Sequence, residues 1–294
     1  MAQQIDVSPD ALADEIAKGV THEVAPDLAY LRLAIVNVVL VGLPEAGDRG
    51  WVLVDAGLIG SKGTIKKAAA ARFGADARPS AIVLTHGHFD HVGVLENLVA
   101  EWDVPVYAHQ RERPYLDGSA SYPSADPTVG GGLMALLSPL YPRSPVDVGP
   151  RLKDLPLDGS VPPLPGWKAI ETPGHAVGHV SFWRESDRSL VVGDAFVTTA
   201  QESVYAAATQ EPELHGPPMY LTPDWVSAKA SVQKLAALAP ELVIPGHGRA
   251  MSGPALRSAL DELARRFDEV AVPEGGRYVG HPARVEDGSA YPKP

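Results

Sequence analysis

The chain has 294 residues, of which 45% are hydrophobic, so it can bury a sizeable core and global disorder is not expected. Its net charge of −11 and the lack of a dense Lys/Arg run argue against nucleic acid as the main partner, because a negative surface repels phosphates. Since the chain has no cysteine, disulfides and thiolate metal sites are excluded, and any metal must be held by nitrogen and oxygen.

The N-terminal residues favour a short helix. Ser8, Pro9 and Asp10 indicate a cap followed by proline at the first helical position, and Gly19 indicates the end, so a helix is predicted at about 9–18. The same stretch has no basic start and no apolar signal core. No apolar run approaches the ~20 residues that cross a bilayer. We therefore expect a soluble cytoplasmic protein with no membrane partner.

Strand and helix patterns follow along the rest of the chain. Runs rich in Val, Ile and Leu predict strands at 28–42, 51–57, 81–85, 104–109, 167–171, 180–184, 189–193 and 241–246. Helix-forming composition and apolar spacing predict helices at 61–73, 93–102, 223–238 and 253–270. The chain is long enough to combine these elements in one large domain of the α/β (α+β) class.

Residues 110–166 differ from the rest because Pro and Gly recur throughout them. A loop-rich stretch of this length in a compact domain is usually functional, as a lid or a binding loop. Its apolar residues from Leu133 to Tyr141 suggest a short packed helix. With no tandem repeat and no convincing linker, we expect a single domain over 1–294, with a lid-like insertion at about 110–166 and a tail from about 272.

Four polar clusters each follow an apolar strand pattern. In chain order they are His86, His88, Asp90 and His91 after 81–85, His175 after 167–171, Asp194 after 189–193, and His247 after 241–246. Strand ends bring distant segments together at one edge of a sheet, so these five histidines and two aspartates are expected to meet there. Alternate residues in an extended turn, such as His86 and His88, can point towards one ion. Nitrogen and oxygen ligands suit zinc, and also iron or manganese.

The motif His86-x-His88-x-Asp90-His91, followed in order by His175, Asp194 and His247, resembles the ligand signature of the metallo-β-lactamase-fold hydrolases. The stretches "VDAG" (54–57), "TPGHAVGHVSFW" (172–183) and "VVGDAF" (191–196) are similar to other motifs of that superfamily, and the resemblance covers most of residues 20–250. It implies a four-layer αββα sandwich with metals at one edge. It also implies a first metal on His86, His88 and His175, a second on Asp90, His91 and His247, and Asp194 as the bridge between them.

The resemblance further implies an activity. We expect two divalent metal ions, zinc in the first place with iron or manganese open, and a bridging hydroxide that cleaves an ester, thioester or lactone-like bond of a small molecule. In this interpretation Asp194 holds both metals and Asp90 assists proton movement. The motifs look most like those of bacterial hydrolases related to glyoxalase II-like and lactonase-like proteins.

Other functions share the same ligand set. The main alternative is a mononuclear iron persulfide dioxygenase, which uses only the first metal position and oxidises its substrate. A β-lactamase and a non-catalytic metal-binding module are further alternatives. The sequence also leaves open whether the protein forms a homodimer.

Four further side chains are candidates for contacts with the ligands or with substrate. Asp55 ends a strand, where it either caps a turn or orients a ligand histidine. His179 lies four residues after His175 and is expected to support a ligand or to be structural. His215 and Tyr220 lie between Asp194 and the next predicted helix, where each is a candidate for touching substrate.

Overall fold

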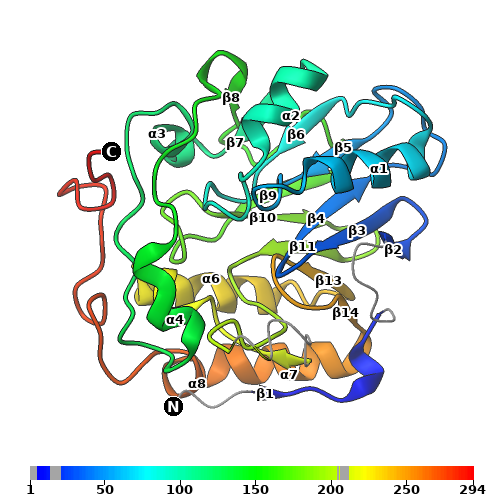
Figure 1. Ribbon diagram of the computed structural model, residues 1–294. Coiled ribbons are helices and arrows are strands. Elements are labelled where there is room, and N and C mark those ends of the chain that lie inside the picture. The colour runs from blue at the N-terminus through cyan, green and yellow to red at the C-terminus, as the bar shows by residue number, and fades with distance from the viewer. Residues whose placement is uncertain (1–4, 14–20, 204, 206–211) are drawn as a thin grey trace.

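Two β-sheets lie at the centre of the molecule, with α1 and α2 on one side and α6 and α7 on the other (Figure 1). The computed structural model describes residues 5–13, 21–203, 205 and 212–294. The larger sheet has seven strands, in the spatial order β2 (Thr21–Ala25), β3 (Leu28–Leu33), β4 (Val36–Val41), β5 (Val52–Val54), β6 (Ala81–Val83), β7 (Val106–Ala108) and β8 (Leu152–Asp154).

The smaller central sheet has five strands. Their spatial order is β14 (Met251–Ser252), β13 (Leu242–Pro245), β11 (Ser189–Gly193), β10 (Val180–Arg184) and β9 (Trp167–Glu171). A separate pair consists of β1 (Ile5–Asp6) and β12 (Glu213–Leu214).

Four helices cover the sheets, and shorter ones lie in the connections. The long helices are α1 (Lys62–Phe73), α2 (Leu95–Trp102), α6 (Trp225–Ala237) and α7 (Gly253–Arg265). The short ones are η1 (Pro9–Ala11), η2 (Gln110–Glu112), α3 (Arg113–Leu116), α4 (Leu133–Leu137), η3 (Ser138–Leu140), η4 (Gly149–Arg151), η5 (Met219–Leu221) and α8 (Phe267–Val270). None of the helices in the described ranges is both long and apolar enough to cross a bilayer.

Three clusters of buried apolar side chains fill the spaces between neighbouring layers. Between the two sheets, Tyr30, Val54 and Val83 pack with Phe182, Val191 and Ile244. Under α1 and α2, Leu31, Leu53 and Ile82 pack with Ile65, Leu98 and Trp102. Under α6 and α7, Leu190 and Val243 pack with Val232, Leu256 and Leu260. Because both faces of β3 and β4 are covered, every residue of these two strands is buried. The four-layer αββα arrangement expected from the motifs is therefore confirmed.

The β-rich run predicted at 28–42 forms two strands, β3 and β4, which make a hairpin. Leu33 pairs with Val36 across a two-residue turn, in which Ala34 takes a φ of 56°. The prediction missed this turn because neither turn position is Gly, Asn or Asp, the residues that usually mark a left-handed conformation.

The last predicted helix is shorter than expected, and the first can be compared with the structure only in part. Of the helix at 9–18, the described part is only η1, and Leu12 already bridges to Met251; residues 14–18 lie outside the described residues. The helix at 253–270 is divided into α7 and α8 at Arg266, which leaves the helical conformation with φ −106° and ψ 18°. The separate turn of α8 lets Phe267 enter the core fully buried.

The segment expected to be loop-rich, 110–166, also contains regular structure. It begins with η2 and α3, and further along it contains β8, which pairs in parallel with β7 at the edge of the large sheet. Between them, α4 and η3 occupy the stretch where apolar residues suggested a packed helix. The helix is there, but the packing is not as expected, because the side chains of Leu133, Leu136, Leu137 and Leu140 are exposed.

The strand directions explain why distant parts of the chain meet. β5 and β6 run parallel in the large sheet, and β11 and β13 run parallel in the small one. β9 and β11 are both antiparallel to β10, so β9 runs in the same direction as β11. The loops after these strands therefore leave each sheet at one edge, which is where catalytic and binding residues are usually held.

Candidate metal centre

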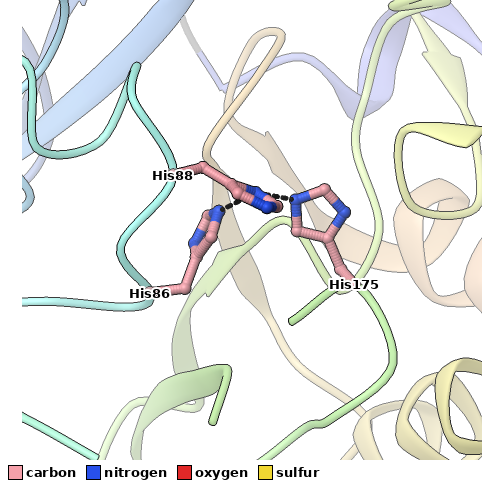
Figure 2. A group of neighbouring side chains, drawn as sticks. All are labelled: His86, His88 and His175. Atoms are coloured by element: carbon pink, nitrogen blue, oxygen red, sulfur yellow. Dashed lines mark hydrogen bonds between the residues drawn. The ribbon is translucent and has the colours of Figure 1, made fainter. Parts of the chain in front are cut away.

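Three imidazole rings converge from two of these loops (Figure 2). His86 and His88 follow β6, and His175 follows β9. Nδ1 of His88 lies 3.0 Å from Nε2 of His86 and 2.9 Å from Nε2 of His175. Nitrogens that share a tetrahedral metal at 2.0–2.1 Å lie about 3.3 Å apart, so this spacing is close to that of a metal site. All three rings are buried.

A second group of possible ligands lies beside the first. Asp90, His91 and His247 bring one ligand atom each to within 4.8 Å of one another. Asp194, at the end of β11, faces both groups through Oδ2, which lies 3.4 Å from Nε2 of His175 and 3.0 Å from Nε2 of His247. The structure thus brings together all seven side chains that the sequence singled out, with Asp194 between the two groups.

The inner atoms of this cluster fit a cation. Nε2 of His91 and Oδ1 of Asp194 are buried, lie 3.4 Å apart, and have no hydrogen-bond partner in the described part of the chain. A buried polar atom without a partner costs about 1–3 kcal/mol, so a metal bound by both atoms would remove an energetic penalty. The donor set of imidazole nitrogen and carboxylate oxygen is also the one that zinc, iron and manganese accept.

The ionisable groups of the cluster influence one another strongly. Burial lowers the pKa of His88 to about 3, which keeps its imidazole neutral. Burial also disfavours charge on His91, but Asp194 and Asp55 outweigh it and raise the pKa of His91 well above its usual value. His247 and His91 likewise outweigh burial at Asp194 and hold its pKa well below the usual value. The buried carboxylates therefore attract positive charge, which metal ions would supply.

Asp55 orients two of the histidines from outside. Its Oδ2 accepts a hydrogen bond from Nδ1 of His91 at 2.8 Å, and its two oxygens accept from the backbone N–H and the hydroxyl of Thr85, each at 2.8 Å. Because the Thr85 hydroxyl donates to Asp55, it accepts from Nδ1 of His86, 3.1 Å away. Both rings therefore donate through Nδ1 and turn Nε2 towards the cluster, which is the nitrogen that a metal would bind in the neutral ring.

Two further histidines of the cluster are held by groups that the sequence did not indicate. Nδ1 of His247 donates to the carbonyl oxygen of Ile35 at 2.7 Å, so the turn of the β3–β4 hairpin reaches the site. Nδ1 of His175 donates to the hydroxyl of Thr222 at 3.3 Å, since that hydroxyl itself donates to the carbonyl oxygen of Pro218. The sequence could not indicate Ile35, because any residue type offers the same backbone carbonyl group. A single threonine such as Thr222 is also only a weak indication of a role at the site.

His179 and His215, two of the remaining candidates, differ in whether they contact the proposed ligands. His179 accepts the backbone N–H of Asp194 at 2.9 Å through Nε2, and its Nδ1 lies 2.8 Å from the hydroxyl of Thr172. It therefore supports Asp194 through the backbone. His215 contacts none of the seven proposed ligands in the hydrogen bonds and ion pairs of the described residues: its backbone pairs with that of Val197, and its Nε2 is 3.4 Å from Glu213.

Tyr220 lies near the carboxylates of Asp90 and Asp194. It is buried, and burial raises its pKa well above the usual value, with the charges of Glu202, Asp90 and Asp194 adding to the shift. Its ring lies 5.9 Å from that of Tyr141, which in turn lies 5.3 Å from Phe89, the residue before Asp90.

Glu112 was not among the sequence candidates, yet it is a fully buried carboxylate next to the ligand loops. Burial raises its pKa to about 7, against the opposing effect of hydrogen bonds from Tyr122, Gly178 and Gly87. The glycines at 87 and 178, each one residue before a histidine, were the signal that something approaches the backbone closely there.

Comparison with known proteins gives the site its family. The model of the metallo-beta-lactamase superfamily matches residues 31–247. Over 238 residues the chain is 46% identical to Probable metallo-hydrolase YflN of Bacillus subtilis, which covers 81% of this chain and 90% of that protein. A hydroxyacylglutathione hydrolase of Bdellovibrio bacteriovorus is 30% identical over 115 residues, which is 39% of this chain and 34% of that protein.

Solved structures agree on the fold. A beta-lactamase domain protein from Burkholderia ambifaria has a TM-score of 0.58 at 22% identity, over 87% of this chain and 79% of that chain. MEM-A1, a subclass B3 metallo-beta-lactamase from a soil metagenome library, has a TM-score of 0.57 at 20% identity, over 88% of this chain and 96% of that chain. The family match and the His/Asp cluster together imply divalent metal ions. The chain belongs to the metallo-beta-lactamase superfamily.

Proposed function

We propose that this protein is a metallo-hydrolase that holds two divalent metal ions and cleaves an ester, thioester or lactone-like bond of a small molecule. The observation that carries the proposal is the position of Asp194 between two groups of ligands, because a single tetrahedral ion needs only four donors. The names of the relatives support hydrolysis as the reaction type: one is a probable metallo-hydrolase, and another is a hydroxyacylglutathione hydrolase.

Each side chain has a role in this proposal. His86, His88 and His175 hold the first ion, and Asp90, His91 and His247 hold the second, with Asp194 shared between them. We propose that both ions are zinc. When bound, two such ions supply a hydroxide nucleophile at neutral pH and a Lewis acid for the substrate carbonyl.

The chain itself provides position and proton transfer. Oδ2 of Asp90 lies 3.4 Å from Nε2 of His247, where its carboxylate can pass a proton to the leaving group. Phe89, Tyr141 and Tyr220 provide an aromatic surface next to Asp90 against which an apolar part of a substrate can pack. We propose that the lid-like insertion at about 110–166 covers this aromatic surface and sets substrate preference without supplying a metal ligand.

The test is His247→Ala, measured beside wild type and the control His281→Ala, which changes an exposed histidine. We expect about two metal equivalents in wild type and one in His247→Ala. Loss of the second ion should reduce hydrolysis of an activated ester, thioester or lactone at least about a hundredfold, since ~3 kcal/mol of barrier corresponds to that factor.

Two results would contradict the proposal. A firm value of one equivalent in metal-saturated wild type would exclude the dinuclear site. Oxygen uptake with a persulfide that is undiminished in His247→Ala, with no hydrolysis by either protein, would favour the mononuclear dioxygenase instead.

A further inference from the structure

Glu112 connects two loops that carry proposed ligands of the first metal. Its Oε2 accepts the backbone N–H of Gly87 at 2.9 Å, and its Oε1 accepts the backbone N–H of Gly178 at 2.8 Å. Gly87 lies between His86 and His88, and Gly178 lies in the loop that carries His175. One carboxylate thus bridges a loop of the seven-stranded sheet and a loop of the five-stranded sheet.

The two glycines provide the space for this bridge. A Cβ atom at position 178 would lie 2.8 Å from the backbone nitrogen of Glu112 and 2.9 Å from its Cγ and Oε1. A Cβ atom at position 87 would lie 3.0 Å from the hydroxyl oxygen of Tyr122. Distances below 3.0 Å are not tolerated in real structures, so the close approach of Glu112 requires glycine at position 178.

Tyr122 completes the arrangement on the side of the metal cluster. Its hydroxyl donates to Oε2 of Glu112 and lies 2.8 Å from the backbone nitrogen of Gly87. Its ring packs on His88 with centroids 4.1 Å apart, and on Tyr115 with centroids 3.8 Å apart. The Tyr122 hydroxyl also accepts the backbone N–H of Gly87, whereas the backbone N–H groups of Gly87 and Gly178 can only donate, so each oxygen of Glu112 has to accept one of them.

We propose that Glu112 is a positioning residue, whose buried carboxylate holds the His86–His88 loop and the His175 loop at the separation that the first metal needs. This inference rests on the proposed metal site. Its physical basis is that the three imidazole nitrogens are delivered by backbones from two different sheets, and that the Glu112 carboxylate accepts a backbone N–H from each of these two loops. Such outer contacts typically change metal affinity by about 10–100-fold.

Glu112→Gln tests the inference, because it keeps the shape but turns an NH₂ group towards one of the two backbone N–H donors. The matched control is Glu96→Gln, which makes the same change where an exposed carboxylate accepts the backbone N–H of Asp147 at 2.9 Å. Each protein is titrated with zinc against a competing chelator, and the cobalt-substituted form is examined by its visible absorption spectrum. We expect Glu112→Gln to weaken one binding step by about 10–100-fold and to alter the cobalt spectrum, and Glu96→Gln to do neither.

The outcomes separate the two levels of the proposal. If wild type binds no metal, the proposed function fails. If wild type binds metal and a folded Glu112→Gln has the same affinities and spectrum, the positioning role alone is overturned. Should Glu112→Gln fail to fold, Gly178→Ala decides, since its Cβ atom would meet both the backbone nitrogen and the carboxylate of Glu112 and so disturb the bridge: at least tenfold weaker binding supports the role, and unchanged binding refutes it.

Discussion

Asp55 shows how a single side chain can order a metal site without binding the metal. It has a left-handed φ of 62°, which is uncommon for a residue other than glycine. That conformation ends β5 and aims the carboxylate at Thr85 and His91, where it accepts three hydrogen bonds. Of the two roles that the sequence left open, a turn cap and an orienting acceptor, these contacts favour the second.

Asp55→Asn should therefore weaken metal binding while leaving the backbone intact. Asn tolerates the left-handed conformation, but its amide offers an oxygen on one side only, so either Thr85 or His91 faces a donor. We expect zinc affinity to fall by about 10–100-fold in chelator competition. The control is Asp48→Asn, which breaks an exposed pair with Arg78 and should leave the affinity unchanged. Equal affinity of Asp55→Asn and wild type would show that His91 needs no such partner.

At the scale of elements, the stretch from Leu133 to Tyr141 lies beside the site but contributes none of the seven proposed ligands. Tyr141 donates its hydroxyl to the carbonyl oxygen of Met134 at 2.9 Å, and its ring lies 5.3 Å from that of Phe89. The backbone of Met134 bonds the carbonyl oxygen of Glu202 at 3.3 Å. α4 and η3 are thus attached to the substrate side of the proposed centre through these contacts.

Replacing residues 133–141 with a short Gly/Ser linker should change selectivity and spare the metal. Loss of apolar contacts of a methylene or more changes discrimination by about 10–200-fold, so the ratio of kcat/KM between ester and thioester substrates should shift at least about tenfold. Metal content should stay at the wild-type value. Leu157→Ala, at a side chain that is 81% exposed outside this stretch, is the control. A folded variant that has lost its metal would contradict the assignment.

At the scale of the whole molecule, the proposed ligands come from both sheets. His86, His88, Asp90 and His91 follow a strand of the seven-stranded sheet, whereas His175, Asp194 and His247 follow strands of the five-stranded sheet. Bound metal would therefore join the two halves of the sandwich at one edge. Without metal, the same edge holds buried carboxylates and imidazoles, and Nε2 of His91 and Oδ1 of Asp194 have no hydrogen-bond partner among the described residues.

Metal removal should accordingly lower the thermal stability. A ligand that binds only the folded state contributes about 2.7 kcal/mol at a hundred times its Kd, which corresponds to several degrees in Tm for a chain of this size. Thermal unfolding is measured after chelation and again after zinc is restored, and we expect Tm to fall and then recover. His247→Ala should show a smaller recovery, because one site is incomplete. An identical Tm with and without bound metal would mean that the site does not join the sheets.

The sequence by itself determined the local parts of this protein. The motif from His86 to His91, and the strand patterns that precede His175, Asp194 and His247, predicted which side chains would meet and at which end of the strands. These features are local: a ligand type, a spacing, and an apolar run before it. Most strands and helices were predicted for the same reason, because periodicity and composition are read over a few neighbouring residues.

Only the tertiary structure decided which groups support those side chains. Glu112, Ile35 and Thr222 lie 25 or more residues from the residues that they hold, and no local pattern marks them. The turn at Ala34 was hidden for a related reason, since its conformation is imposed by the pairing of β3 with β4 and not by a turn residue. The residue type decides which side chains can bind a metal. Their orientation depends on strand register and on contacts across the sandwich, which form only when the sheets pack together.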